Sequence, residues 1–162
     1  MEKKKPIKRH PAIVEFSRDH HFALLLVWKI KEGLKKSIEI SRISKYVVHF
    51  YDTNLIHHFK EEETMLFNKI TITDPLVLKT ESEHVDMRNL IEVLRNNSDD
   101  KKSLESFSAL LEKHVRFEER ELFNYLQEHI PEKVLAEVEA SIESRTYRTD
   151  GDWEDTFWER EK

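Results

Sequence analysis

The sequence contains no cysteine, only two glycines and only four prolines among its 162 residues. The lack of cysteine excludes disulfides, thiolate zinc sites, iron–sulfur clusters and cysteine nucleophiles. Any bound metal must therefore be held by histidine, aspartate and glutamate side chains. The scarcity of glycine and proline leaves few turn residues for a sheet protein. The composition thus favours long helices joined by few loops.

Long apolar runs are missing as well. The longest, FALLLVW at residues 22–28, has seven residues and is too short to cross a bilayer. The basic N-terminus is not followed directly by an apolar run, so it does not predict a signal peptide. The formal net charge of −5 argues against a nucleic-acid partner, which needs a basic face. We therefore expect a cytoplasmic protein with neither a membrane nor a nucleic-acid partner.

Amphipathic periodicity is the main pattern that the sequence does contain. Charged residues make up 36% of the chain and hydrophobic residues 38%, with heavy use of Glu, Lys, Leu and Ile. Four segments repeat apolar residues at steps of three and four, which predicts four helices of about 20 to 30 residues. Boundaries are indicated at Pro11, near 36–39, at Asp74–Pro75, at 96–99, which would cap the fourth helix, and at Pro131.

These elements predict an all-α fold, an antiparallel up-down four-helix bundle over residues 11–130. A basic tail precedes it at 1–10, and a short helix (132–145) with an acidic, aromatic tail follows within 131–162. Trp153 and Phe157 lie four residues apart in that tail, so a short turn there could dock on the bundle or on a partner. Packing on the same chain, or disorder, is favoured over a dedicated recognition motif.

Two segments of the chain are similar to each other. HFKEEETMLF (58–67) and HVRFEERELF (114–123) share the histidine, two glutamates and the closing Leu-Phe. In each, the histidine and the first shared glutamate, four residues later, lie on the apolar stripe of the helix. Beside them, Glu63 and Glu119 are expected to be solvated or loop-facing rather than to contact a metal.

Histidines also interrupt the two remaining stripes, at His20 and His84. His20 is preferred to His21 because it continues its stripe toward further apolar residues. Distances from the predicted loops place all four histidines at one level of the bundle. Buried polar groups cost free energy unless they are paired, so this layer predicts a metal site rather than a purely structural polar network. Four imidazoles and two carboxylates suit iron, and also manganese, zinc or copper, with the glutamates able to bridge two metals.

Four motifs in this order, SRDHHFALLLVWKI, HFKEEETMLF, SEHVDMRNL and HVRFEERELF, resemble the hemerythrin-like, HHE-type cation-binding family over residues 10–130. The resemblance implies a four-helix bundle with a non-haem di-iron centre. It also implies oxygen binding, a response to nitric oxide, peroxide or iron, or repair of iron centres. The implied metal ligands are His20, His58, Glu62, His84, His114 and Glu118.

The chain departs from that pattern at one ligand. Oxygen-carrying members of the family have a fifth histidine, four residues from the one on the third helix, where this chain has Thr80 or Arg88. The gap could be filled by water or by a neighbouring side chain, the candidates being His57, Glu61, Glu63 and Glu81. It could equally give a substrate room to bind. Arg88 could instead pair with a bridging glutamate.

The leading expectation is therefore a protein that binds non-haem iron, as a di-iron pair, and engages dioxygen, nitric oxide or peroxide. Manganese or zinc could substitute for the iron, and the protein would be a monomer or a homodimer. One alternative is an iron-dependent enzyme acting on peroxide or nitric oxide, or a protein that supplies iron to damaged centres. Another is a helical interaction module without metal.

Overall fold

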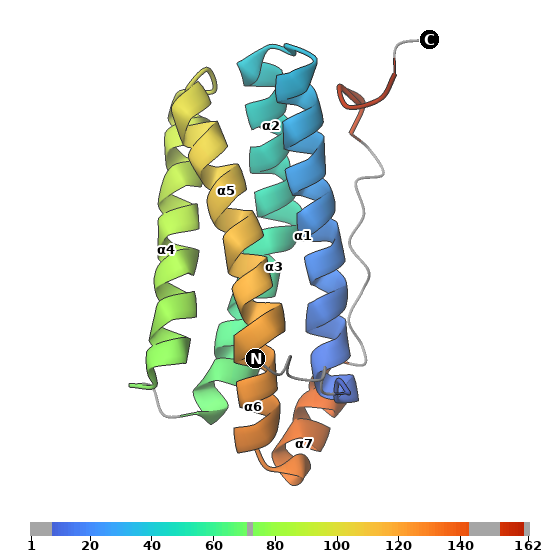
Figure 1. Ribbon diagram of the computed structural model, residues 1–162, viewed down its shortest axis with the longest axis vertical. Coiled ribbons are helices and arrows are strands. Elements are labelled where there is room, and N and C mark those ends of the chain that lie inside the picture. The colour runs from blue at the N-terminus through green and yellow to red at the C-terminus, as the bar shows by residue number, and fades with distance from the viewer. Residues whose placement is uncertain (1–7, 71–72, 143–152, 161–162) are drawn as a thin grey trace, which may run out of the picture.

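Four helical rods form the body of the protein, and short loops join them in an up-down order (Figure 1). The computed structural model describes residues 8–70, 73–142 and 153–160, and these contain helices but no strands. Each rod packs against the next one in the chain, and the fourth packs against the first. The predicted all-α bundle is confirmed. Within the described chain, no helix is long and apolar enough to cross a membrane.

The first and third rods are single helices, α1 (Pro11–Lys35) and α4 (Pro75–Asn96). The second and fourth are each built from shorter helices in line. The second consists of α2 (Ile40–Phe50), a π-helical turn (Tyr51–Leu55), α3 (Ile56–Glu61), a further π-helical turn (Glu62–Leu66) and a 3₁₀ turn (Phe67–Lys69). The fourth consists of α5 (Lys101–Phe117), a π-helical turn (Glu118–Leu122) and α6 (Phe123–His129).

Capping residues in the sequence mark the start of the third rod and, one residue later than expected, that of the fourth. The Asp74 carboxylate accepts a hydrogen bond from the backbone N–H of Leu76 at 2.9 Å, and Pro75 fills the first helical position of α4. The fourth rod was expected to be capped from within residues 96–99. Its cap is instead Asp100, whose Oδ1 accepts from the N–H of Ser103 at 3.0 Å. Several cap-forming residues in a row blur this boundary in the sequence.

Two apolar clusters fill the bundle, one toward each end. Tyr46, Met87 and Phe107 belong to the cluster near the loop between α1 and α2. Phe16 and Phe123 belong to the cluster near the other end. The layer of histidines and glutamates predicted from the sequence lies where one cluster gives way to the other. On the first rod, for example, His20 stands between Phe16 of one cluster and Ala23 of the other.

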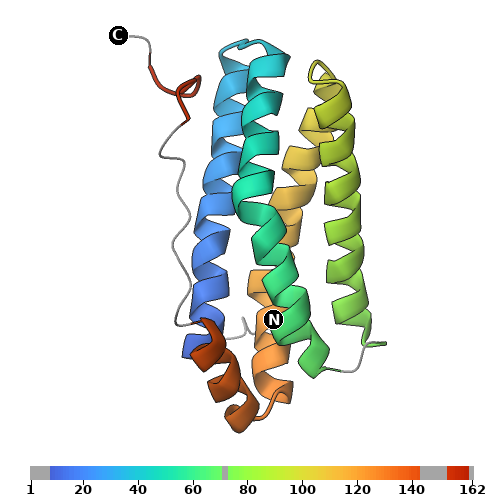
Figure 2. The same ribbon diagram turned by 180° about the vertical axis from the view of Figure 1, so that it is seen from behind.

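Two C-terminal segments cover the ends of the first rod (Figures 1 and 2). Helix α7 (Glu132–Ile142) packs against α1, and the rest of the predicted fifth helix, 143–145, lies outside the described residues. Residues 153–160, the docked tail, pack at the opposite end with Phe157 only 4% exposed. Gly33 makes room for it, since a Cβ there would lie 2.9 Å from the Phe157 ring and 2.8 Å from Ile43. The tail thus packs on its own chain, as the sequence favoured.

Candidate metal centre

All six residues expected to bind metal meet in the polar layer between the two apolar clusters. They come from all four rods, and none is more than 4% exposed. Their donor atoms form two groups of four, and within each group one atom from every residue lies within 4.8 Å of the others. The groups are His20, His58, Glu62 and Glu118, and Glu62, His84, His114 and Glu118. The two glutamates thus belong to both groups, while each pair of histidines belongs to one.

Several inward-facing atoms of this layer lack a hydrogen bond among the described residues. They are the Nε2 atoms of three histidines and both carboxylate oxygens of one glutamate: His58, His84, His114 and Glu62. Their neighbours are near but poorly aligned, with His58 Nε2 2.8 Å and His84 Nε2 3.6 Å from Glu62 Oε1. A buried polar atom without a partner costs about 1–3 kcal/mol. Such atoms converging on one place fit a bound cation, which all of them could coordinate.

A carboxylate holds the outer nitrogen of every histidine in the layer. The Nδ1 atoms lie 2.8–3.0 Å from the carboxylates of four residues, called here the outer carboxylates: Asp19 with His58, Glu63 with His84, Glu83 with His114, and Glu119 with His20. An ionised carboxylate can only accept, so each Nδ1 carries the hydrogen. In a metal complex each Nε2 then offers its lone pair inward, which is the usual arrangement of histidine ligands.

The outer carboxylates form a closed ring around the bundle. Each is the sequence neighbour of an inward-facing residue on its own rod, yet it binds the histidine of the next rod. Asp19 of the first rod binds the second, Glu63 binds the third, Glu83 binds the fourth, and Glu119 of the fourth binds the first. Glu63 and Glu119 keep 42% and 31% of their side chains exposed and belong to neither group of converging atoms, as expected, but the sequence did not indicate that each would hold a histidine. Asp19 and Glu83 were missed entirely, although their position beside His20 and His84 was a usable signal.

Both repeated segments change from α-helix to π-helix at the same position. One π-helical turn begins at Glu62 and the other at Glu118, so each starts at the glutamate of the polar layer. Single π-helical turns within α-helices occur frequently at functional sites. Here they widen the rod where its glutamate faces the interior.

Of the two positions that could carry a fifth histidine, Thr80 and Arg88, Thr80 is the one that is fully buried. Its hydroxyl donates a hydrogen bond to Glu118 Oε2 at 2.7 Å. Phe16 lies four residues before His20, as Thr80 lies four before His84, and its ring centroid is 6.1 Å from that of His58. A hydroxyl therefore lies beside the layer on α4, where the matching position of α1 carries an aromatic ring.

The other candidates for filling that gap do not converge on the centre. Arg88 is exposed on α4, and among the described residues it forms no ion pair with either shared glutamate, so the possible pairing is not seen. His57 is also exposed, and Glu63 is an outer carboxylate. Glu61 and Glu81 are half-buried and belong to neither group of converging atoms in the described chain. His21, the rejected alternative to His20, is exposed as well.

The pKa values of the two shared glutamates are shifted in opposite directions. Burial, and then the nearby Glu118 carboxylate, raise the pKa of Glu62 well above its ordinary value. Burial also acts to raise the pKa of Glu118, but His114 and His20 outweigh it and hold that pKa well below the usual range. Burial would lower the pKa of His114, yet Glu118 and Glu83 raise it to about 9. Two carboxylates in so small a volume repel each other, and a cation between them would relieve this.

The hemerythrin family model, described as the hemerythrin HHE cation binding domain, matches residues 12–126. Searches of curated proteins and of solved structures gave no match. The matched residues run from the first turn of α1 into α6. They include all six inward-facing residues and all four outer carboxylates.

Proposed function

The chain belongs to the hemerythrin HHE cation-binding domain family, and we propose that its polar layer holds a non-haem di-iron centre that binds oxygen, nitric oxide or peroxide. The observation that supports this best is the sharing of Glu62 and Glu118 between two histidine pairs. A carboxylate has two oxygens and can bridge two cations, whereas each imidazole Nε2 serves one. The pattern therefore supports two adjacent metal positions rather than one.

The donor set also supports the choice of metal. Imidazole and carboxylate together suit iron, while manganese and zinc are chemically acceptable substitutes. Four imidazoles and two carboxylates bring less negative charge than a carboxylate-rich site. This balance favours reversible binding of a small ligand over strongly oxidising chemistry. Iron would supply the electron exchange that binding of a diatomic ligand needs.

The surrounding residues would orient the ligands and exclude water. The outer carboxylates hold each histidine in one tautomer, with Nε2 directed inward. The apolar clusters above and below the layer keep its side chains buried. Thr80 adds no imidazole, so the group containing His84 and His114 would offer a metal four protein donors and leave a coordination position for a small exogenous ligand. The Thr80 hydroxyl meanwhile fixes one oxygen of Glu118.

The presence of threonine rather than histidine at position 80 also favours a second candidate function. With one histidine fewer than the family's oxygen carriers, the centre would bind one of its irons less firmly. A loosely held iron suits an enzyme acting on peroxide or nitric oxide, or a protein that supplies iron to damaged centres. In either case the six inward-facing residues would keep the same roles.

The test is to load the protein anaerobically with ferrous iron and measure metal content and visible spectrum before and after adding oxygen. We expect two irons per chain, one for each group of donor atoms, and a charge-transfer band that appears with oxygen and fades on its removal. Neighbouring histidines provide matched controls. His58→Ala should lower iron binding and abolish the band, whereas His57→Ala, which alters an exposed side chain, should change neither.

The other outcomes separate the candidates. Two irons that oxidise irreversibly, consume peroxide or leave the protein readily would favour the enzyme or the iron-supply role. A folded protein without stoichiometric metal would contradict both functions and leave a metal-free helical module. Equal losses in His58→Ala and His57→Ala would contradict the assignment of His58 as a ligand.

A further inference from the structure

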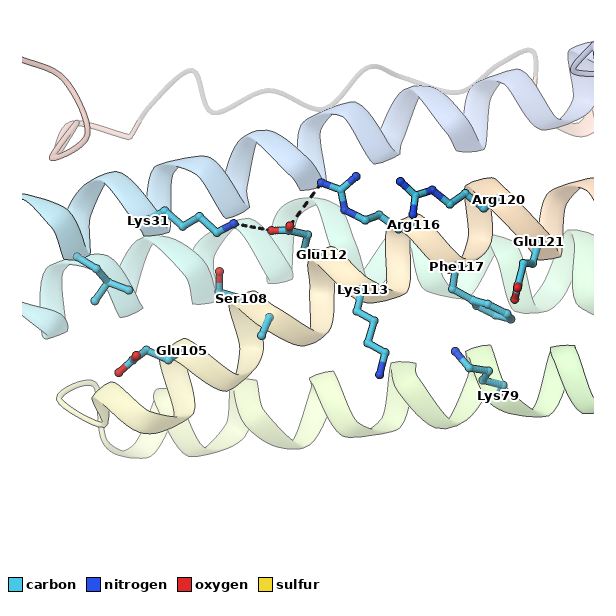
Figure 3. Close-up of a pocket in the computed structure, with 12 residues that line it drawn as sticks. Lys31, Lys79, Glu105, Ser108, Glu112, Lys113, Arg116, Phe117, Arg120 and Glu121 are labelled. Atoms are coloured by element: carbon cyan, nitrogen blue, oxygen red, sulfur yellow. Dashed lines mark hydrogen bonds and ion pairs between the residues drawn. The ribbon is translucent and has the colours of Figure 1, made fainter. Parts of the chain in front are cut away.

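A groove of about 740 Å³ runs along the outer side of α5, away from the polar layer (Figure 3). Lys31 of α1 lies on one side of it and Lys79 of α4 on the other. In Figure 3, Lys79 and Lys113 extend into the space between α4 and α5, whereas Arg116 and Arg120 extend toward α1. Phe117 and Leu34 contribute apolar surface to its lining. The groove thus combines an apolar lining with cations on both sides.

Its charge is opposite to that of the protein as a whole. Five basic and three acidic residues line it, in a chain with a formal net charge of −5. Glu112 pairs with two of the cations, Lys31 at 2.7 Å and Arg116 at 3.4 Å. Lys113 and Arg120 are exposed, and neither has an ion-pair partner in the described part of the chain. A local positive surface on an acidic protein attracts and orients an acidic partner, which the remaining surface repels.

The groove is connected to the polar layer by a short series of contacts. The ammonium of Lys79 lies 3.7 Å from the ring centroid of Phe117 and 3.1 Å from Glu83 Oε2. The other oxygen of that carboxylate, Oε1, lies 2.9 Å from Nδ1 of His114. Two polar contacts therefore separate a groove cation from an imidazole that faces the interior. Glu83 is the outer carboxylate through which this face of the protein is linked to the centre.

We propose that this groove is the docking surface for an acidic one-electron carrier protein, which delivers electrons to the centre by way of Glu83 and His114. The inference rests on the proposed iron-binding function. The inward-facing residues are at most 4% exposed, so a protein donor cannot touch the metal and must transfer electrons from outside the bundle. In each encounter the carrier loses one electron and one ferric ion becomes ferrous. The apolar lining and the unpaired cations suit an acidic protein surface.

The experiment uses iron-loaded, fully oxidised protein and follows its reduction anaerobically by stopped flow. The donor is a reduced, acidic plant-type [2Fe–2S] ferredoxin, and dithionite serves as a small reductant that needs no docking. The groove variant is Lys113→Glu with Arg120→Glu. The control variant, Lys45→Glu with Lys133→Glu, alters two exposed lysines outside the groove and changes net charge equally. In the described part of the chain, none of the four side chains forms a hydrogen bond or ion pair with an inward-facing residue or an outer carboxylate.

At low ionic strength, we expect the groove variant to lower the second-order rate constant with ferredoxin about tenfold relative to the control variant. The wild-type rate should fall as salt is added, because screening weakens attraction between the two surfaces. Dithionite should reduce all three proteins at similar rates. Equal ferredoxin rates in the two variants, or a wild-type rate that does not fall with salt, would overturn the proposal.

Metal content and the visible spectrum are measured first. They distinguish a failure of the docking surface from a failure of the proposed iron-binding function. A protein that binds iron and is reduced by dithionite, but shows no effect of the groove, refutes the docking surface alone. A protein that binds no iron refutes the proposed function and this inference with it.

Discussion

Glu83 on α4 accepts a hydrogen bond from Nδ1 of His114 on α5 at 2.9 Å, across the boundary between two rods. Three equivalent contacts complete the circuit of the bundle. Every rod therefore contributes to the centre in two ways, through one or two inward-facing residues and through a carboxylate that orients the histidine of its neighbour. Second-layer contacts of this kind fix the tautomer and raise the basicity of histidine ligands.

Removing one outer carboxylate should weaken metal binding without removing a ligand. For Asp19→Ala we expect about a 10- to 100-fold loss of affinity, because His58 loses the acceptor that fixes its tautomer. Competition between the protein and a chelator for cobalt(II) measures this. Asp86→Ala, an exposed position on α4, is the control and should bind cobalt like the wild type. Equal affinities in the two variants would show that the ring does not support the metal.

Thr80→Val keeps the shape of a buried side chain but removes its hydroxyl, leaving Glu118 Oε2 without that donor. We expect unfolding free energy to fall by about 1–3 kcal/mol in urea with a chelator present. Thr80→Ser retains the hydroxyl and loses one methyl group, so its cost should be about 0.8 kcal/mol. A valine variant as stable as the serine variant would mean that the hydroxyl does not stabilise Glu118.

Gly33→Ala should displace the docked tail, because the added Cβ would lie 2.9 Å from the Phe157 ring. Of the three tryptophans in the chain, Trp153 and Trp158 are in this segment and Trp28 lines a pocket with Trp158. We therefore expect tryptophan emission to shift to longer wavelength. Phe157→Ala removes the clash with the ring and leaves only the one with Ile43, so adding Gly33→Ala to it should shift emission much less than Gly33→Ala does alone. A coupling near zero between the two substitutions would contradict the close contact.

The docked tail should also respond to acid. Hydrogen bonds from Arg42 lower the pKa of Asp155 below its ordinary value of 3.8. A carboxyl whose pKa is depressed by folding stabilises the folded form above its ordinary pKa, and this contribution is lost as pH falls through the lowered value. Tryptophan emission of the wild type and of Asp155→Asn should therefore differ near neutral pH and converge in strong acid. A difference that persists below both pKa values would contradict the assignment.

Periodicity was sufficient to predict the inward-facing residues, because a stripe at helical spacing also identifies the polar residues that interrupt it. His20, His58 and Glu62 were found in this way, without knowledge of how the rods are arranged. Periodicity alone could not identify the outer carboxylates. Asp19 and Glu83 lie one residue off the stripe, and their roles depend on which rod is the neighbour. The same dependence on the assembled bundle hid the contact of Thr80 with Glu118.

The π-helical turns and the docked tail show two further limits of sequence reasoning. A histidine followed by a glutamate four residues later fits a regular α-helix, so nothing in the spacing indicated the change at Glu62 and Glu118. The tail was recognised as amphipathic, but its place on the bundle depends on the space above Gly33. That space is visible only once Ile43 and Phe157 are seen on either side of it.

The closed ring has a consequence for the internal symmetry of the chain. The first two rods contribute a carboxylate, two histidines, a shared glutamate and a second carboxylate, and the last two contribute the same set in the same order: Asp19, His20, His58, Glu62 and Glu63, then Glu83, His84, His114, Glu118 and Glu119. One helical hairpin is thus half of the centre, and two copies about a twofold axis would rebuild it. The equivalence does not extend to the residue four positions before the first histidine of each half. That residue is Phe16 in the first half and Thr80 in the second. The two groups of donor atoms therefore have different surroundings, although the residues that form them match in type and order.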